Sequence, residues 1–172
     1  MSANPSANLV LTVIADDKPG IVEILSATIA DNGGNWLESR MAQLAGKFAG
    51  ILRISVPSEQ ANGLMEALLK LDTQGILVRI EATTDPAAES GLKLNIHVVG
   101  NDRSGIVKEI SKVLAGLGVN VLELTTRCTA AEMSAVPLFR SDLLVSMPAS
   151  LSTDDVSDAL EALSDDLMVE IS

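Results

Sequence analysis

The sequence predicts an α+β protein built from two βαββαβ units in tandem, and three observations lead to that prediction. The 172-residue chain repeats itself once, and its apolar residues switch between strand and helix spacing in the same order in each half. In addition, 47% of its residues are hydrophobic whereas only 20% are charged. This composition is typical of a folded globular chain with enough aliphatic surface to bury a core in each half.

The internal repeat is the strongest of these observations. Residues 9–39 align with residues 94–124 at a constant offset of 85 positions and without a gap. Beyond this block the offset grows to 91, which indicates six additional residues within 129–137. The identical pairs include Asp17/Asp102, Gly20/Gly105 and Asn35/Asn120.

The first half begins with a strand and a helix. A nearly continuous apolar run at 9–14 predicts a buried strand. The helix is predicted to begin after Pro19-Gly20, with Asp17 as its N-cap and Gly33-Gly34 at its end. Its apolar stripe consists of Ile21, Val22, Leu25 and Ile29.

A hairpin, a second helix and a last strand complete this half. The runs at 36–44 and 48–56 flank Ala45-Gly46-Lys47, a spacing typical of a hairpin. Leu64, Leu68 and Leu71 mark the second helix, and the apolar run at 76–80 is the last strand. The corresponding elements of the second half are predicted at 92–99, 106–117, 119–128, 138–147, 154–163 and 167–171.

The order βαββαβ is the split βαβ plan of ferredoxin-like folds, in which both helices cover one face of a four-stranded antiparallel sheet. The Pro, Ser, Gly and small residues that separate the two halves predict a short linker. The expected organisation is therefore an N-terminal domain at 1–84, a linker at 85–91 and a C-terminal domain at 92–172.

Charge and composition exclude several classes of function. A net charge of −11 repels phosphate backbones, so neither direct nucleic-acid binding nor binding to an anionic membrane is expected. A single Cys128 permits no internal disulfide, and no signal peptide is evident, so we expect a cytoplasmic protein. With one His and one Cys, we expect no metal, no other cofactor and no catalytic residues.

The two strand-to-helix loops are the candidate ligand sites. The start of a helix offers unpaired N–H donors and a partial positive charge for a carboxylate, while glycine leaves room for it to approach. An adjacent aspartate can bind an ammonium group, so each loop could meet both ends of an amino acid. The simpler interpretation is that Asp17 and Asp102 only cap their helices; Asn35 and Asn120 are likewise open to interpretation as turn residues. The candidate residues are Asp17, Lys18, Pro19, Gly20, Ile21, Asn35, Asp102, Arg103, Ser104, Gly105, Ile106 and Asn120.

The motifs D-K-P-G-I-V and D-R-S-G-I-V, each followed by a helix and G-x-N, resemble the ACT domain, a family of amino-acid-sensing regulatory modules. The family often has proline where the second copy has Ser104. By this resemblance Asp17, Gly20 and Asn35, with Asp102, Gly105 and Asn120, match the family's ligand-loop positions. Ligands of the family bind between paired units, so the resemblance implies pairing within one chain or in a homodimer.

Two such units without a catalytic or DNA-binding domain resemble an accessory transcriptional repressor. The resemblance implies that such a protein restrains a DNA-bound transcriptional activator through protein contact, with glycine as the leading candidate ligand. The alternative is an amino-acid-binding regulatory subunit of a metabolic enzyme. Arg103 and Asn120 are residue types that an acylphosphatase uses, but this sequence lacks the glycine-rich arginine loop of those enzymes. An RNA-recognition module would need aromatic residues on its central strands, and the corresponding strands here are aliphatic.

The sequence also predicts where three single residues and one acidic cluster lie. His97 should face away from the core side of its strand, whereas Cys128 is expected to be a small buried apolar group. Trp36 is expected to pack in the core. Acidic residues share one face of the last helix, which is either solvated or a surface for a basic partner. They are Asp154, Asp158, Glu161 and Asp165.

Overall fold

The computed structural model describes residues 5–84, 91–130 and 136–172, and the chain divides into two compact units, Met1–Ala87 and Ala88–Ser172. We refer to them as unit 1 and unit 2. The predicted linker at 85–91 lies outside the described residues except for Gly91, and much of the predicted insertion at 129–137 also lies outside them. These boundaries stay predictions.

Unit 1 has the predicted βαββαβ order, with one sheet and two helices. The strands form an antiparallel sheet in the order β2-β3-β1-β4. The elements are β1 (Ser6–Asp16), α1 (Ile21–Asp31), β2 (Asn35–Leu44), β3 (Lys47–Pro57), α2 (Ala61–Leu69) and β4 (Ile76–Thr83). Short 3₁₀ turns at Ser58–Gln60 and Lys70–Gln74 flank α2.

Unit 2 repeats this arrangement with the sheet order β6-β7-β5-β8. Its elements are β5 (Leu92–Asn101), α3 (Ile106–Gly116), β6 (Asn120–Thr129), β7 (Leu138–Met147), α4 (Thr153–Glu161) and β8 (Met168–Ile171). The ferredoxin-like fold class is therefore confirmed in both halves, and the observed element ends differ from the predicted ones by only a few residues.

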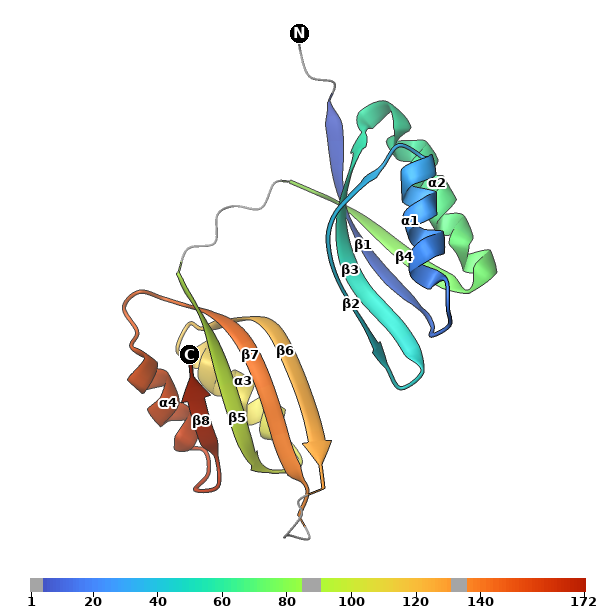
Figure 1. The fold of residues 1–172 in the computed structure, drawn as a ribbon. Helices are drawn as coiled ribbons and strands as arrows, with labels where there is room; N and C mark the ends of the chain where they lie inside the picture. The colour runs from blue at the N-terminus through green and yellow to red at the C-terminus, as the bar shows by residue number, and fades with distance from the viewer. Residues whose placement is uncertain (1–4, 85–90, 131–135) are drawn as a thin grey trace. The chain divides into compact units, whose positions relative to one another are not determined.

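One face of each sheet lies under two helices and the other is open (Figure 1). The alternation along β1 shows this directly, because Leu9, Leu11 and Val13 are buried whereas Thr12 and Ile14 are exposed. In α1 the buried residues are Ile21, Leu25 and Ile29, so the prediction that Val22 shares the buried stripe is wrong. Trp36 packs against the core of unit 1, as predicted.

Both edge strands that follow the first helix of a unit contain a bulge at the same place in the repeat. The register shifts between Trp36 and Glu38 in β2, and between Val121 and Glu123 in β6. The residues that absorb the shift, Leu37 and Leu122, lie 85 positions apart, as the internal repeat requires. The duplication therefore extends to an irregular feature of the backbone.

The glycine before each first helix has a backbone conformation that other residues rarely adopt. Gly20 has φ 94° and Gly105 has φ 85°, and no atom would lie within 4 Å of an added Cβ at either position. Conformation rather than lack of space therefore requires glycine here, because a left-handed residue with a Cβ is strained.

We expect Gly20→Ala to lower the free energy of unfolding by about 1 kcal/mol, since alanine would have to adopt the left-handed conformation. Gly63→Ala is the matched control in the same unit, because Gly63 lies within α2 with equally open surroundings. The control should raise the free energy of unfolding by up to about 1 kcal/mol. Urea denaturation of both variants measures the difference, and equal effects would contradict the conformational explanation.

Candidate ligand-binding loops

The loop of unit 1 joins β1 to α1 and is held in place by backbone hydrogen bonds. The Asp17 N–H donates to the Gly46 carbonyl in the β2–β3 turn at 2.9 Å. Gly20 occupies the N-cap position of α1, and its carbonyl accepts from the Ile24 N–H at 2.9 Å. The loop is thus anchored at one end to the sheet and at the other to the helix.

The loop of unit 2 has the same framework. The Asp102 N–H donates to the Pro137 carbonyl at 2.9 Å, just before β7. Gly105 is the N-cap residue of α3, and its carbonyl accepts from the Glu109 N–H at 3.0 Å. Equivalent backbone bonds therefore place the two loops equivalently within their own units.

The prediction that Asp17 and Asp102 cap the helices is wrong. Neither α1 nor α3 receives a side-chain cap hydrogen bond, and in each helix the cap residue is the left-handed glycine three residues after the aspartate. The left-handed turn delays the start of the helix beyond the reach of the aspartate. Both aspartates are exposed, so capping does not account for them.

The side chains between aspartate and helix differ in the two loops. The Lys18 ammonium donates to the Gln74 carbonyl at 3.4 Å, at the end of the turn before β4. Arg103 instead forms an ion pair with Glu109 of α3. Pro19 and Ser104 are both exposed, and a hydroxyl in unit 2 thus replaces a rigid ring in unit 1.

The isoleucine that begins each helix belongs to the core. Ile21 is 3% exposed and Ile106 is 4% exposed. Their side chains anchor the helix start to the sheet, and in unit 2 the Ile106 N–H donates to the Arg103 carbonyl at 3.4 Å. Gly20 and Gly105 are partly or fully accessible beside them.

Asn35 and Asn120 do not join the loop residues of their own units. Asn35 begins β2 and pairs with Ser55, which in turn pairs with Asn8 near the start of β1. The loop follows Asp16, eight residues further along β1, which is roughly 26 Å at strand spacing. Asn120 is placed equivalently, since Ser146 pairs with both Asn120 and Lys93. Within one unit the predicted set is therefore divided between opposite ends of the sheet.

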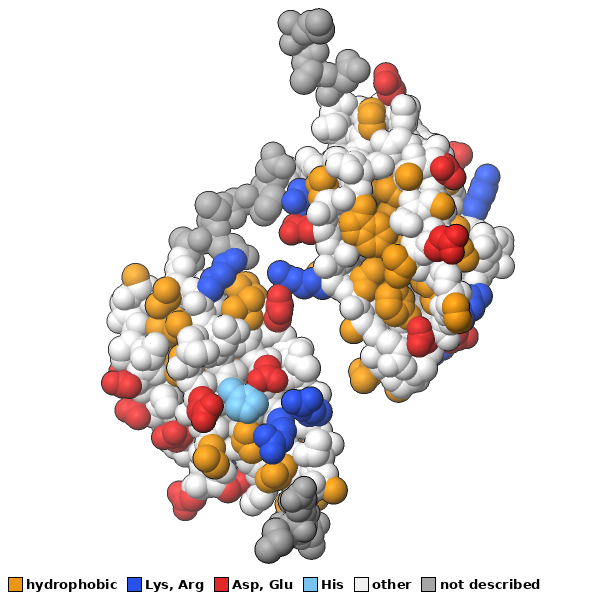
Figure 2. All heavy atoms as spheres, in the orientation of Figure 1, with side chains coloured by type: hydrophobic (Ala, Val, Ile, Leu, Met, Phe, Trp, Pro, Cys, Tyr) orange, Lys and Arg blue, Asp and Glu red, His pale blue; other side chains and the backbone are white. Residues whose placement is uncertain are grey.

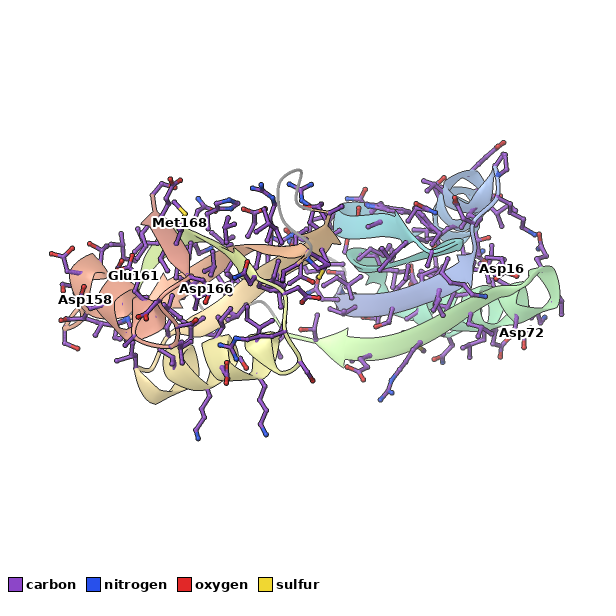
Figure 3. The ribbon with its side chains drawn as sticks, turned by 90° about the horizontal axis from the view of Figure 1, so that it is seen from below. Asp16, Asp72, Asp158, Glu161, Asp166 and Met168 are labelled. Carbon is purple, nitrogen blue, oxygen red and sulfur yellow. The ribbon has the colours of Figure 1, made fainter. Side chains whose placement is uncertain are left out.

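The segment before the last strand lies beside each loop. Figure 3 shows Asp16 and Asp72 at the same end of unit 1, consistent with the bond from Lys18 to the Gln74 carbonyl. In unit 2 the Asp166 carboxylate accepts from the Asn101 N–H at 2.7 Å. Two hydrogen bonds lower the pKa of Asp166 below its ordinary value of 3.8: the larger effect comes from the Ser164 hydroxyl and the smaller from the Asn101 N–H. The end of β5 is thus tied to the turn before β8.

Cys128 lies beside the loop of unit 2 rather than in the core. It is exposed, so the prediction of a buried apolar group is wrong. Partial desolvation raises the pKa of the Cys128 thiol. A hydrogen bond with Asp102 and the negative charge of that residue raise it further. A raised pKa leaves the thiol protonated and makes it a poor nucleophile.

Two other polar groups lie on the open faces of the sheets. His97 faces away from the core, as predicted, and pairs with Asp142 across β5 and β7 (Figure 2). In unit 1 a cavity of about 270 Å³ is lined by residues that include Glu38, Arg40, Ile51 and Arg53, with Arg53 Nε 2.8 Å from Glu38 Oε1. Sequence reasoning missed this cavity, although alternation along β2 and β3 places these side chains on one face.

Among the residues that the structure describes, no three His, Cys, Asp or Glu side chains are grouped so as to hold a metal ion. Within the same ranges, no helix combines the length and apolar character needed to cross a bilayer.

Residues 7–81 match the ACT domain family. The N-terminal unit is an ACT domain. Unit 2 has the same strand order and the same loop, so the predicted tandem of two ACT-type units is confirmed.

Relatives of known structure or function extend the similarity to the whole chain. The glycine cleavage system transcriptional repressors of Escherichia coli (strain K12) and Shigella flexneri are each 25% identical to it, over 97% of this chain and 89% of theirs. A crystal structure of an unknown protein from Galdieria sulphuraria is 26% identical, with a TM-score of 0.84 and 98% of both chains covered. A protein proposed to be a glycine cleavage system transcriptional repressor shares the fold, with a TM-score of 0.73, 17% identity and 97% and 96% coverage of the two chains.

The bond from the Asn101 N–H to Asp166 predicts a pH-dependent contribution to the stability of this ACT-type unit. Because the folded-state pKa of Asp166 is lowered, its contribution is present above the ordinary value of 3.8 and is lost as the pH falls through the lowered value. Asp166→Asn should therefore lower the melting temperature at pH 7, and the difference from the original chain should shrink at strongly acidic pH.

Asp165→Asn is the control, because it removes one charge at the neighbouring exposed position. Thermal unfolding followed by circular dichroism between pH 2 and pH 7 measures both variants. Equal behaviour of the two variants would show that the Asp166 bond does not stabilise this unit.

Proposed function

We propose that this protein is an amino-acid-responsive regulator and acts as an accessory repressor of the glycine cleavage system. In this proposal it makes protein contact with a DNA-bound transcriptional activator and carries out no catalysis. The supporting observation is the duplicated loop, in which an exposed aspartate precedes a left-handed glycine and an eleven-residue helix. Similarity to the two curated repressors along 97% of the chain supports the regulatory role.

The loop suits a small zwitterion for electrostatic reasons. The first N–H groups of α1 and α3 point out of the helix start and carry its partial positive charge, which favours a carboxylate. Neither helix has a side chain capping these donors. Asp17 and Asp102 are exposed beside them and can receive the ammonium group. Glycine is the leading candidate because it has both charged groups and needs no side-chain pocket.

The net charge supports action through a protein. With a net charge of −11 the chain is repelled by DNA, so a regulator of this kind reaches a promoter by contact with a bound activator. Acidic side chains on α4 offer one surface for a basic partner; Figure 3 shows Asp158 and Glu161 on this helix. Such a regulator acts in the compartment that holds the DNA, which is the cytoplasm in bacteria.

Isothermal titration of the full chain with glycine tests the ligand. We expect saturable binding that Asp17→Asn or Asp102→Asn each weakens about tenfold at its own loop, since a charge-assisted hydrogen bond is lost. Asp158→Asn is the control, because it removes one negative charge from α4 and leaves the aspartates of both loops in place. Absence of heat with glycine, alanine and serine alike would exclude amino-acid sensing.

Capture of partners from native lysate, with and without glycine, tests the regulatory role. We expect the immobilised chain to retain a transcriptional activator and glycine to change the amount retained. Retention of a metabolic enzyme in place of a transcription factor would support the alternative, an amino-acid-binding regulatory subunit, and would contradict the repressor proposal.

A further inference from the structure

Two arginines lie directly opposite each other on the open face of unit 2. Arg127 of β6 pairs with Arg140 of β7, which places their Cβ atoms about 5 Å apart. Arg140 follows the buried Phe139 and precedes the buried Ser141, so it faces away from the core. Figure 2 shows Lys and Arg side chains gathered on this face beside the histidine. Like charges at directly opposed positions destabilise a sheet, so the pair is not there to support the fold.

No carboxylate neutralises either guanidinium group among the residues that the structure describes. Asp142 lies two residues from Arg140 on the same face, but it pairs with His97. Asp166 already accepts hydrogen bonds from a backbone N–H and from a hydroxyl. Glu170 lies opposite His97 on β8 and is therefore two strands, roughly 10 Å, from Arg140. The two positive charges are thus left for a partner from outside these ranges.

The equivalent positions of unit 1 carry no charge. Ala42 pairs with Ala49 where β2 and β3 have the matching register. The register matches because the partners of Ala49 and Arg140 on the central strands, Ile14 and Val99, lie 85 positions apart. The same fold therefore forms with two small apolar side chains here, and the sheet does not require the arginines.

A cavity adjoins the arginine pair on the side of β5 and β8. Its volume is about 440 Å³, within the usual range for small-molecule sites. Arg140 lines it together with three apolar side chains, which are Val99, Leu138 and Met168. Arg127, one strand further out, extends the positive charge at the edge of this cavity. The surface therefore offers two cationic groups beside an apolar wall.

We propose that Arg127 and Arg140 bind the phosphate group of a small phosphate monoester whose uncharged body lies in this cavity. A phosphate monoester carries about two negative charges at pH 7, which two guanidinium groups match, and the N–H donors of arginine suit its oxygens. A single carboxylate would neutralise only one of them.

The net charge of −11 does not conflict with this site. It opposes long polyanions such as nucleic acid, whereas a compact anion in direct contact with two arginines interacts mainly with charges inside the Debye length of about 8 Å. The inference goes beyond the proposed function and does not depend on it, because neither arginine belongs to a candidate ligand loop.

Isothermal titration of the full chain with inorganic phosphate, phenyl phosphate and benzoate tests the inference. Phenyl phosphate should bind most tightly, since its ring can contact the apolar wall, and benzoate should bind about tenfold more weakly, since it neutralises one guanidinium. Arg127→Ala and Arg140→Ala should each weaken phenyl phosphate binding about tenfold through loss of a charge-assisted hydrogen bond. Both substitutions introduce the residue that unit 1 has at that position, so the fold should be retained.

Arg79→Ala is the matched control, because it removes one arginine from β4 of unit 1, where Arg79 pairs with Glu81, and should leave phosphate binding unchanged. Thermal unfolding gives a second readout. Phenyl phosphate should raise the melting temperature of the original chain but not that of the chain with both arginines replaced, and without ligand the latter should melt no lower than the original.

Three results would overturn the inference. They are no binding of either phosphate, benzoate binding as tight as that of phenyl phosphate, and equal effects of the Arg127, Arg140 and Arg79 substitutions. Glycine titration of the original chain tests the proposed function separately, so failure of the phosphate site leaves amino-acid sensing intact, and failure of glycine binding leaves the phosphate site intact.

Discussion

Each sheet of this protein buries only one face, and this constraint determines where the loops lie. Because alternate residues of a strand point to opposite sides, the buried side chains of β1 and β5 require helices on one side only. The first helix must therefore begin beside the end of the strand that precedes it. Ile21 and Ile106 bury the helix start, and the left-handed glycines allow the sharp turn that brings it there. The exposed aspartates follow from the same geometry.

The two units share the backbone features of the loop and differ in the side-chain contacts around it. The backbone bonds of Asp17 and Asp102, the left-handed glycines and the bulged edge strands occur in both units. What lies around the framework differs. Arg103 is paired with a helical carboxylate whereas Lys18 reaches a carbonyl. Duplication has thus preserved the shape of the loop and changed its surroundings.

Much of the fold could be predicted from sequence, because periodicity records which face of each element is buried. The element order, the repeat register and the outward direction of His97 all depend on this alternation. The capping residue could not be predicted, since Asp17 has the chemistry of a cap and only the backbone conformation of Gly20 excludes it. Cys128 was wrongly expected in the core because β6 is an edge strand, and apolar patterning does not show how far a helix covers it. The separation of Asn35 from its loop is a matter of topology, which places the start of β2 beside the start of β1.

The bulges at Leu37 and Leu122 bear on how this chain avoids unwanted association. A bulge breaks the regular ladder of donors and acceptors along a strand and increases its twist. In both units it falls on the outermost strand, where a flat edge would otherwise serve as a template for a strand from another molecule. Because this chain has two sheets, it has twice as many strand edges at which another molecule could pair. The bulge makes such pairing less favourable at one edge of each sheet.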